Sequence, residues 1–254
     1  MQVQGETLWR WGLRLAGLAS LLLLWEYFGR AYNNLMLVPF SAVPAALISQ
    51  LGTSELYKAL WISNQAMLIG YFLAALTAVP LGILLARVPW LERFTDSYLT
   101  ILIVTPMSAL IPIIIVAVGL GLSARVIVVF LFSFPIIVIN TRAGLKNLDA
   151  SLLEMAYSLK ATERQLWWHI LLPSALPGVL AGLQLGLARA LSGMIIVELI
   201  LISAGVGKLI LGSMALFEPA TTFALVVVII FEIMVLMSVF RWFSRRCLAW
   251  KEPA

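Results

Sequence analysis

The chain has few of the residues from which catalytic and metal sites are built. Among its 254 residues it contains one cysteine, Cys247, and one histidine, His169. A single cysteine excludes a disulfide within the chain. His169 has no partner residues at metal-ligand spacing, which favours a surface or packing role for its ring. Neither residue points to catalysis or to a metal centre.

A nucleotide-binding loop is also missing. The only Gly-Lys pair, at Gly207, is followed by Leu209 and not by serine or threonine. A phosphate-binding loop begins with glycine, where this chain has Ile202. Charged residues make up only 11% of the sequence, and they form no cluster of titratable groups of the kind that a membrane enzyme needs. We therefore expect no catalytic residues, no bound cofactor and no ATPase activity in this chain.

Apolar residues are abundant instead. They account for 62% of the sequence, and the mean hydropathy is +1.03, more than a soluble domain of this size can bury. They gather in six windows that approach the length needed to cross about 30 Å of hydrocarbon. The windows are residues 11–28, 59–86, 98–118, 126–139, 177–203 and 222–243. This pattern predicts an all-α membrane protein with six transmembrane helices.

The first window resembles a secretory signal, because Arg10 and Arg14 precede an apolar run. No small-x-small cleavage site follows it, so we expect a retained span. The outward segment after it contains an amphipathic stretch, residues 43–51, which predicts a short helix on the membrane surface. The chain then divides into residues 1–58, with the first span and this surface helix, and residues 59–250, a core of five spans.

Lysine and arginine are distributed unevenly between the two sides of the membrane. Twelve of the 17 fall on one side, four fall on the other, and Arg189 lies within the fifth window. The cytoplasmic side carries the excess of positive charge and faces anionic lipid. We therefore expect both termini in the cytoplasm, and membrane lipid, not nucleic acid, as the partner of the net charge of +5.

The loop between the fourth and fifth windows, residues 142–172, carries two predicted helix starts. Each has the S/T-x-x-E/Q spacing of a capping box. The two pairs are Ser151 with Glu154 and Thr162 with Gln165. Two short helices should therefore meet near Lys160.

The first of these short helices has one apolar stripe at helical spacing, with Glu154 on the opposite face. The stripe consists of Leu152, Met155, Ala156 and Leu159. An apolar stripe on so short a loop helix indicates a partner protein. The alternative is that it packs on the chain's own membrane helices.

The run from Glu154 to Pro173 resembles the EAA motif of type I binding-protein-dependent ABC importer permeases. Met155 and Ala156 follow the glutamate, and the interval to the final proline matches. The similarity extends from about Leu37 to Trp250 and is to the nitrate, sulfonate, taurine and pyrimidine-precursor branch. Further matching segments include Pro80-Leu81-Gly82, Gly119-Leu120-Gly121, Glu198, and Gly205 with Gly207.

This resemblance implies the MetI-like type I importer fold, with a coupling helix that sits in a cleft of the ATPase subunit. The residues on motif positions are Glu154, Ala156, Leu159, Ala161, Leu172 and Pro173. Met155 stands where the motif has alanine. Lys160 stands where the family usually has glycine, and a positive φ there would cost lysine about 1–2 kcal/mol. Either Lys160 accepts this strain or the break between the helices has a different geometry.

The resemblance also implies partners and a location. These are two copies of an ATP-binding cassette ATPase that hold ATP and Mg, a second permease copy in a homodimer, and an extracytoplasmic solute-binding protein. The chain would be a multi-pass protein of the bacterial cytoplasmic (inner) membrane and would import a small, often anionic, solute. An ion-gradient-driven secondary transporter is the alternative, which Glu198 and Glu232 keep open.

Small residues recur at four-residue spacing in the fifth window, and they predict a close approach to another helix. They are Gly178, Gly182, Gly186 and Ala190. In the third window Pro106 and Pro112 interrupt the helix. The freed carbonyls, with the hydroxyls of Thr105 and Ser108, either line a translocation path or mark a packing kink.

Polar residues inside the windows are further candidates for the translocation path: Gln184, Arg189, Glu198 and Glu232. Arg189 and Glu232 lie near the middle of their windows at matching depth, where an unpaired charge costs at least about 2.5–3.5 kcal/mol. We predict that they approach each other, within a chain or across a dimer. The alternative is a protonated Glu232 bonded to a backbone carbonyl, with Arg189 in a wet cavity.

Overall fold

The computed structural model describes residues 2–31, 38–147, 150–200 and 204–249, and the regular structure in these ranges is helical throughout. The elements are α1 (Gln2–Ala31), α2 (Ala42–Leu51), α3 (Ser54–Arg87), α4 (Pro89–Val104), α5 (Met107–Val118), α6 (Leu122–Lys146), α7 (Ala150–Ser158), α8 (Glu163–Leu166), the π-helical turn η1 (Trp167–Leu171), α9 (Leu172–Ile200), α10 (Gly205–Ala215) and α11 (Pro219–Cys247).

Four described helical stretches are long and apolar enough to cross a membrane: α3, α6, the continuous run Glu163–Ile200 that ends in α9, and α11. Helices α4 and α5 together make a fifth if their bent pair counts as one span. Helix α1 covers the first predicted window but is not among these candidates. The structure therefore supports four or five of the six predicted spans.

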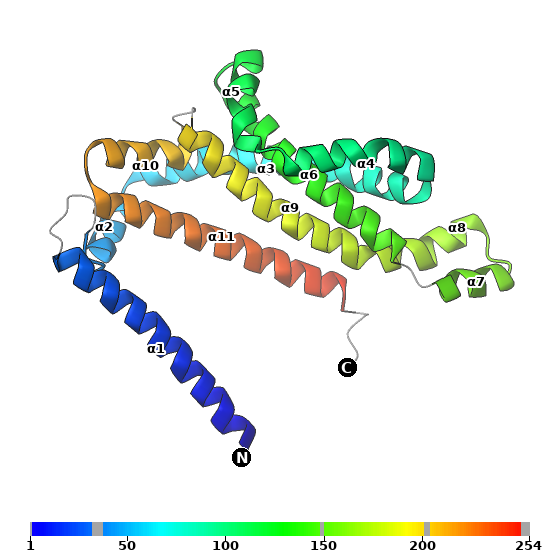
Figure 1. Cartoon of the computed structure of the whole chain (residues 1–254), viewed down its shortest axis with the longest axis horizontal. Coiled ribbons are helices and arrows are strands. Elements are labelled where there is room, and N and C mark those ends of the chain that lie inside the picture. Colours follow the sequence, from blue (N-terminus) through cyan, green and yellow to red (C-terminus); the bar gives the residue numbers. More distant parts are fainter. Residues whose placement is uncertain (1, 32–37, 148–149, 201–203, 250–254) are drawn as a thin grey trace.

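Helices α3, α6 and α9 form the centre of the bundle, with α6 packed against both of the others (Figure 1). Their shared core includes Met67 of α3, Val138 of α6 and Met194 of α9, all fully buried. Glycines bring α6 and α9 together, since a Cβ added to Gly144 would lie 2.7 Å from the Cα of Gly178. A larger side chain at this crossing would force the two backbones apart.

The third predicted window is not one continuous helix but two helices that meet at an angle of 98°. Proline has no backbone N–H, and it drives the preceding residue away from helical dihedrals. Thr105 accordingly adopts φ −63° and ψ 130°, which ends α4, and α5 begins after Pro106. Pro112, in contrast, lies within α5.

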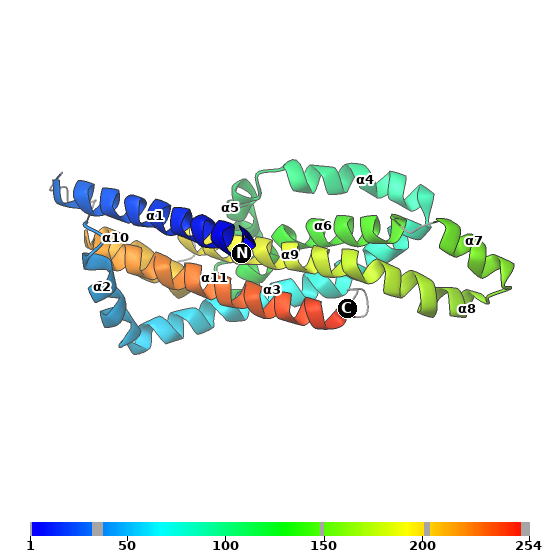
Figure 2. The ribbon, with the colours of Figure 1, turned by 90° about the horizontal axis from the view of Figure 1, so that it is seen from below.

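The predicted short helix at residues 43–51 is present as α2, which packs on α11. Helix α1 leaves the bundle near α2 and points away from α11 (Figure 1). It is held at its C-terminal end, where Trp25 Nε1 donates a 3.0 Å hydrogen bond to the Val38 carbonyl and the indole packs on Phe40 and Phe223. At the opposite end of the bundle, α7 and α8 project beyond α6 and α9 (Figure 2).

Candidate functional site

The turn between α7 and α8 is a Schellman motif centred on Lys160. Lys160 has φ 56° and is therefore left-handed. Its N–H donates to the carbonyl of Tyr157 (2.9 Å), and the N–H of Ala161 donates to the carbonyl of Ala156 (3.0 Å). These are the two bonds that close a helix through a left-handed residue. Lys160 thus adopts the strained conformation for which the family usually has glycine.

Helix α8 begins with the predicted capping box. Thr162 N–H donates to Gln165 Oε1 (2.9 Å), and Gln165 N–H donates to Thr162 Oγ1 (3.4 Å). The other predicted capping box is wrong, because α7 begins at Ala150 and places Ser151 inside the helix. The two short helices still meet at Lys160, as expected from the sequence.

The apolar stripe of α7 divides between the chain's own core and the surface. Ala156 is 3% exposed and packs with Leu145, Leu166, Leu171 and Ala175. The expectation that Ala156 contacts the ATPase is therefore wrong, because the membrane helices and α8 already cover it. Leu152, Met155 and Leu159 are 39%, 53% and 75% exposed and form what we term the exposed stripe.

The remaining motif positions lie around this stripe. Glu154 is exposed, Ala161 packs at the edge of the Ala156 cluster, and Leu172 and Pro173 are half-buried where α9 begins. Two exposed aromatic residues, Tyr157 and Trp168, extend the apolar surface of this segment. These two residues were not predicted from the sequence, although aromatic side chains are enriched at the centres of protein interfaces.

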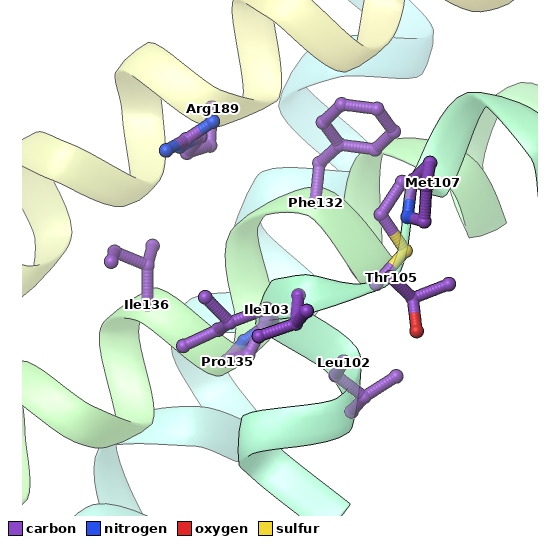
Figure 3. A pocket seen from close by; sticks show the side chains of 10 residues that line it. Leu102, Ile103, Thr105, Met107, Phe132, Pro135, Ile136 and Arg189 are labelled. Atoms are coloured by element: carbon purple, nitrogen blue, oxygen red, sulfur yellow. The ribbon is translucent and has the colours of Figure 1, made fainter.

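A pocket of about 430 Å³ lies where the α4–α5 break faces α6 and α9. Thr105, Pro106 and Met107 of the break line it together with Phe132, Ile136 and Arg189, as Figure 3 shows. We term it the Arg189 pocket. Of the other path candidates, Ser108 and Gln184 are half-buried and are not among its lining residues.

The predicted pairing of Arg189 with Glu232 is wrong within one chain. Glu232 of α11 accepts a hydrogen bond from the side chain of Asn64 on α3, whereas Arg189 faces the pocket beside α6 (Figure 3). No ion pair joins the two side chains in the part of the chain that the structure describes. The two residues point to different helices, because matching depth does not fix the rotation of either helix about its axis.

Glu198 does not line the pocket but lies fully buried in a polar network. Ser63 Oγ is 2.8 Å from both carboxylate oxygens, and the N–H of Gly207 donates to Oε2 at 3.1 Å. Arg125 Nη1 lies 3.5 Å from Oε1 and donates to the carbonyl of Ile62. We term these residues the Glu198 network. Glu198 thus lies where four helices pack together, α3, α6, α9 and α10.

Two members of this network were not predicted from the sequence. Arg125 directly precedes the fourth predicted window, but the structure places it in α6 with 7% of its surface exposed. Ser63 lies 135 positions from Glu198. The network also explains why glycine is needed at Gly205, one of the residues that resemble the family. Gly205 has φ 58°, and a Cβ added to it would lie 2.7 Å from Glu198 Cδ. In the described ranges no group of three or more histidine, cysteine, aspartate or glutamate side chains is arranged to hold a metal ion.

Two transport permeases resemble this chain along most of its length. The protein named as a putative aliphatic sulfonates transport permease of Bacillus subtilis is 28% identical over 250 residues, which cover 96% of this chain and 88% of the relative. The taurine transport system permease of Escherichia coli is 26% identical over 215 residues, or 80% of this chain and 78% of the relative.

A solved structure shares the fold. The inward-facing methionine ABC transporter MetNI superposes with a TM-score of 0.67 at 19% identity, over 76% of this chain and 96% of the matched chain. The family model described as the binding-protein-dependent transport system inner membrane component matches residues 78–248. Since this match spans both the α7–α8 turn and the membrane core, the chain belongs to that family and is the permease component of an ABC transporter.

Proposed function

We propose that this permease imports a small anionic solute and is coupled to a separate ATPase through the exposed stripe of α7. The observation that carries the proposal is the exposure of Leu152, Met155 and Leu159 on a helix that is closed by a Schellman motif and anchored through Ala156. A rigid helix that leaves three apolar side chains in water is suited to a cleft in a partner protein.

The proposal includes a topology of six spans, with α1 as the first and both termini in the cytoplasm. The excess of lysine and arginine on one side supports this orientation. Helix α11 ends toward the α7–α8 end of the bundle, while α2 and α10 lie at the other end (Figure 1). Residues 1–58 would then form the first span with the outward surface helix, and residues 59–250 would form the five-span core with the coupling loop 142–172.

The proposed assembly contains two permease copies, two ATPase subunits that carry ATP and Mg, and an extracytoplasmic solute-binding protein in the bacterial inner membrane. The sulfonate and taurine named for the two relatives suggest a solute with a fixed negative charge. Membership in an ABC permease family argues against the ion-gradient-driven alternative. The buried network also argues against this alternative, because Glu198, one of the two residues that keep it open, is hydrogen-bonded there.

The coupling assignment is tested by placing charge on the exposed stripe. We expect Leu152→Asp combined with Leu159→Asp to abolish co-purification of the ATPase and solute-stimulated ATP hydrolysis, because a carboxylate cannot enter an apolar cleft without a partner. Leu216→Asp is the control, since Leu216 is 72% exposed, close to the 75% of Leu159, but lies beyond α10 at the other end of the bundle. Retention of a stoichiometric, active ATPase by the double variant would reject the coupling role.

A further inference from the structure

The Arg189 pocket carries a single charge. Its other lining residues within the described ranges are apolar apart from Thr105. Arg189 comes from the middle of α9 and lines the pocket together with Phe132 and Ile136 of α6 (Figure 3). A charged side chain at this depth in a membrane protein faces a water-filled space or a partner, because lipid does not solvate it.

The described chain provides no counter-ion for Arg189. The two carboxylates nearest to it in membrane depth are engaged elsewhere, Glu232 with Asn64 and Glu198 with Ser63 and Arg125. The guanidinium also does not reach water at the nearer end of α9, since 11 residues separate Arg189 from Ile200 and 11 residues of helix rise about 16 Å. Within the described chain, the charge therefore faces the pocket without a counter-ion.

Two helix ends meet at the same pocket. Helix α5 begins at the break, and Pro106 and Met107 at its start line the pocket. The first N–H groups of a helix lack intrahelical acceptors, and the helix dipole makes this end positive. Leu102, Ile103 and Val104 in the last turn of α4 line the pocket as well, and the negative end of α4 offsets the positive end of α5, so Arg189 is the net charge there.

We infer that Arg189 forms an anion-binding subsite within the permease. This inference rests on the proposed function, in which the pocket belongs to the solute path. A volume of about 430 Å³ holds a small sulfonate or nitrate-sized anion. Charge selection then occurs in the membrane as well as in the binding protein, and a cation or a neutral solute of the same size is disfavoured at this point.

A cysteine placed in the pocket measures both its hydration and its potential. In a Cys247→Ser background, Ile136→Cys is treated with an anionic and a cationic methanethiosulfonate of similar size, in the assembled complex in proteoliposomes. We expect the anionic sulfonatoethyl reagent to react at least about tenfold faster than the cationic trimethylammonioethyl reagent, because a fixed cation in an apolar recess concentrates anions. Methanesulfonate should slow the anionic reaction by competing for the subsite.

Variants at Arg189 decide the outcome. Arg189→Gln should remove the preference for the anionic reagent and the protection by methanesulfonate, while Arg189→Lys should keep both. Leu76→Cys, on an exposed part of α3, serves as the lipid-facing control and should react with neither reagent. Equal rates for the two reagents, no reaction at Ile136→Cys, or an unchanged preference in Arg189→Gln would each overturn the subsite. This test measures reagent rates at the pocket, whereas the coupling test measures retention of the ATPase and ATP hydrolysis, so the two failures are distinguishable.

Discussion

At the scale of single residues, the Glu198 network shows how a buried charge is tolerated in a membrane protein. Its carboxylate receives hydrogen bonds from a serine and a backbone amide and lies beside a buried arginine. Removing one member of such a pair leaves the other charge buried without compensation, which costs about 3–5 kcal/mol. If Glu198 were replaced, Arg125 would be the buried charge without compensation. Its Nε already has no hydrogen-bond acceptor in the described structure.

We therefore predict that Glu198→Leu lowers the melting temperature of the purified permease more than the double variant Glu198→Leu/Arg125→Met. The double variant removes both charges and leaves apolar side chains of similar size. Thermal unfolding followed by size-exclusion chromatography in detergent measures the difference, and Glu198→Gln serves as the near-isosteric control. If the single variant were as stable as the natural chain, the network would contribute nothing to packing.

The left-handed Lys160 makes a second prediction at this scale. Lys160→Gly should relieve strain of about 1–2 kcal/mol, reduced by about 0.4–1 kcal/mol through the greater freedom of glycine in the unfolded chain. The amides of α7 should consequently exchange more slowly with solvent in a hydrogen-exchange experiment. Lys160→Val should have the opposite effect, because a β-branched residue tolerates φ 56° poorly. Faster exchange in the glycine variant would show that the lysine side chain itself stabilises the turn.

At the scale of elements, the α4–α5 break follows from one proline and not from two. Pro106 ends α4, whereas Pro112 is accommodated inside α5, where the buried Ile111 packs on Ala124, Val128 and Val197.

Replacing the proline tests its role in the break, because Pro106→Ala restores an N–H and removes the restriction on Thr105. We predict that the distance between spin labels at Phe94 and Val116 then becomes longer and more broadly distributed, as part of the population straightens. Pro112→Ala should leave it unchanged. A distribution unaffected by Pro106→Ala would mean that packing of α5 alone maintains the bend.

At the scale of the whole molecule, local patterns predicted the elements better than their contacts. Apolar windows located α3, α6, α9 and α11, and the spacing of Thr162 and Gln165 located the start of α8. Both signals are contained within one or a few helical turns. The pairing of Arg189 with Glu232 within one chain is wrong because counting residues gives the depth of a side chain but not its direction, which depends on the helix against which it packs. The partnership of Ser63, Arg125 and Glu198 depends on the crossing of three helices far apart in the sequence, and no single segment records it.

The run from Glu163 to Ile200 is continuous over 38 residues, through α8, η1 and α9. At about 1.5 Å per residue such a rod is about 57 Å long. It starts beside the exposed stripe, carries Arg189 along its length and ends next to the Glu198 network. A rod of this length converts a tilt of about 5° at one end into a displacement of about 5 Å at the other. A small rotation imposed on α8 by a nucleotide-driven partner would thus reach Arg189 as a shift of several ångströms, comparable to the width of a small anion.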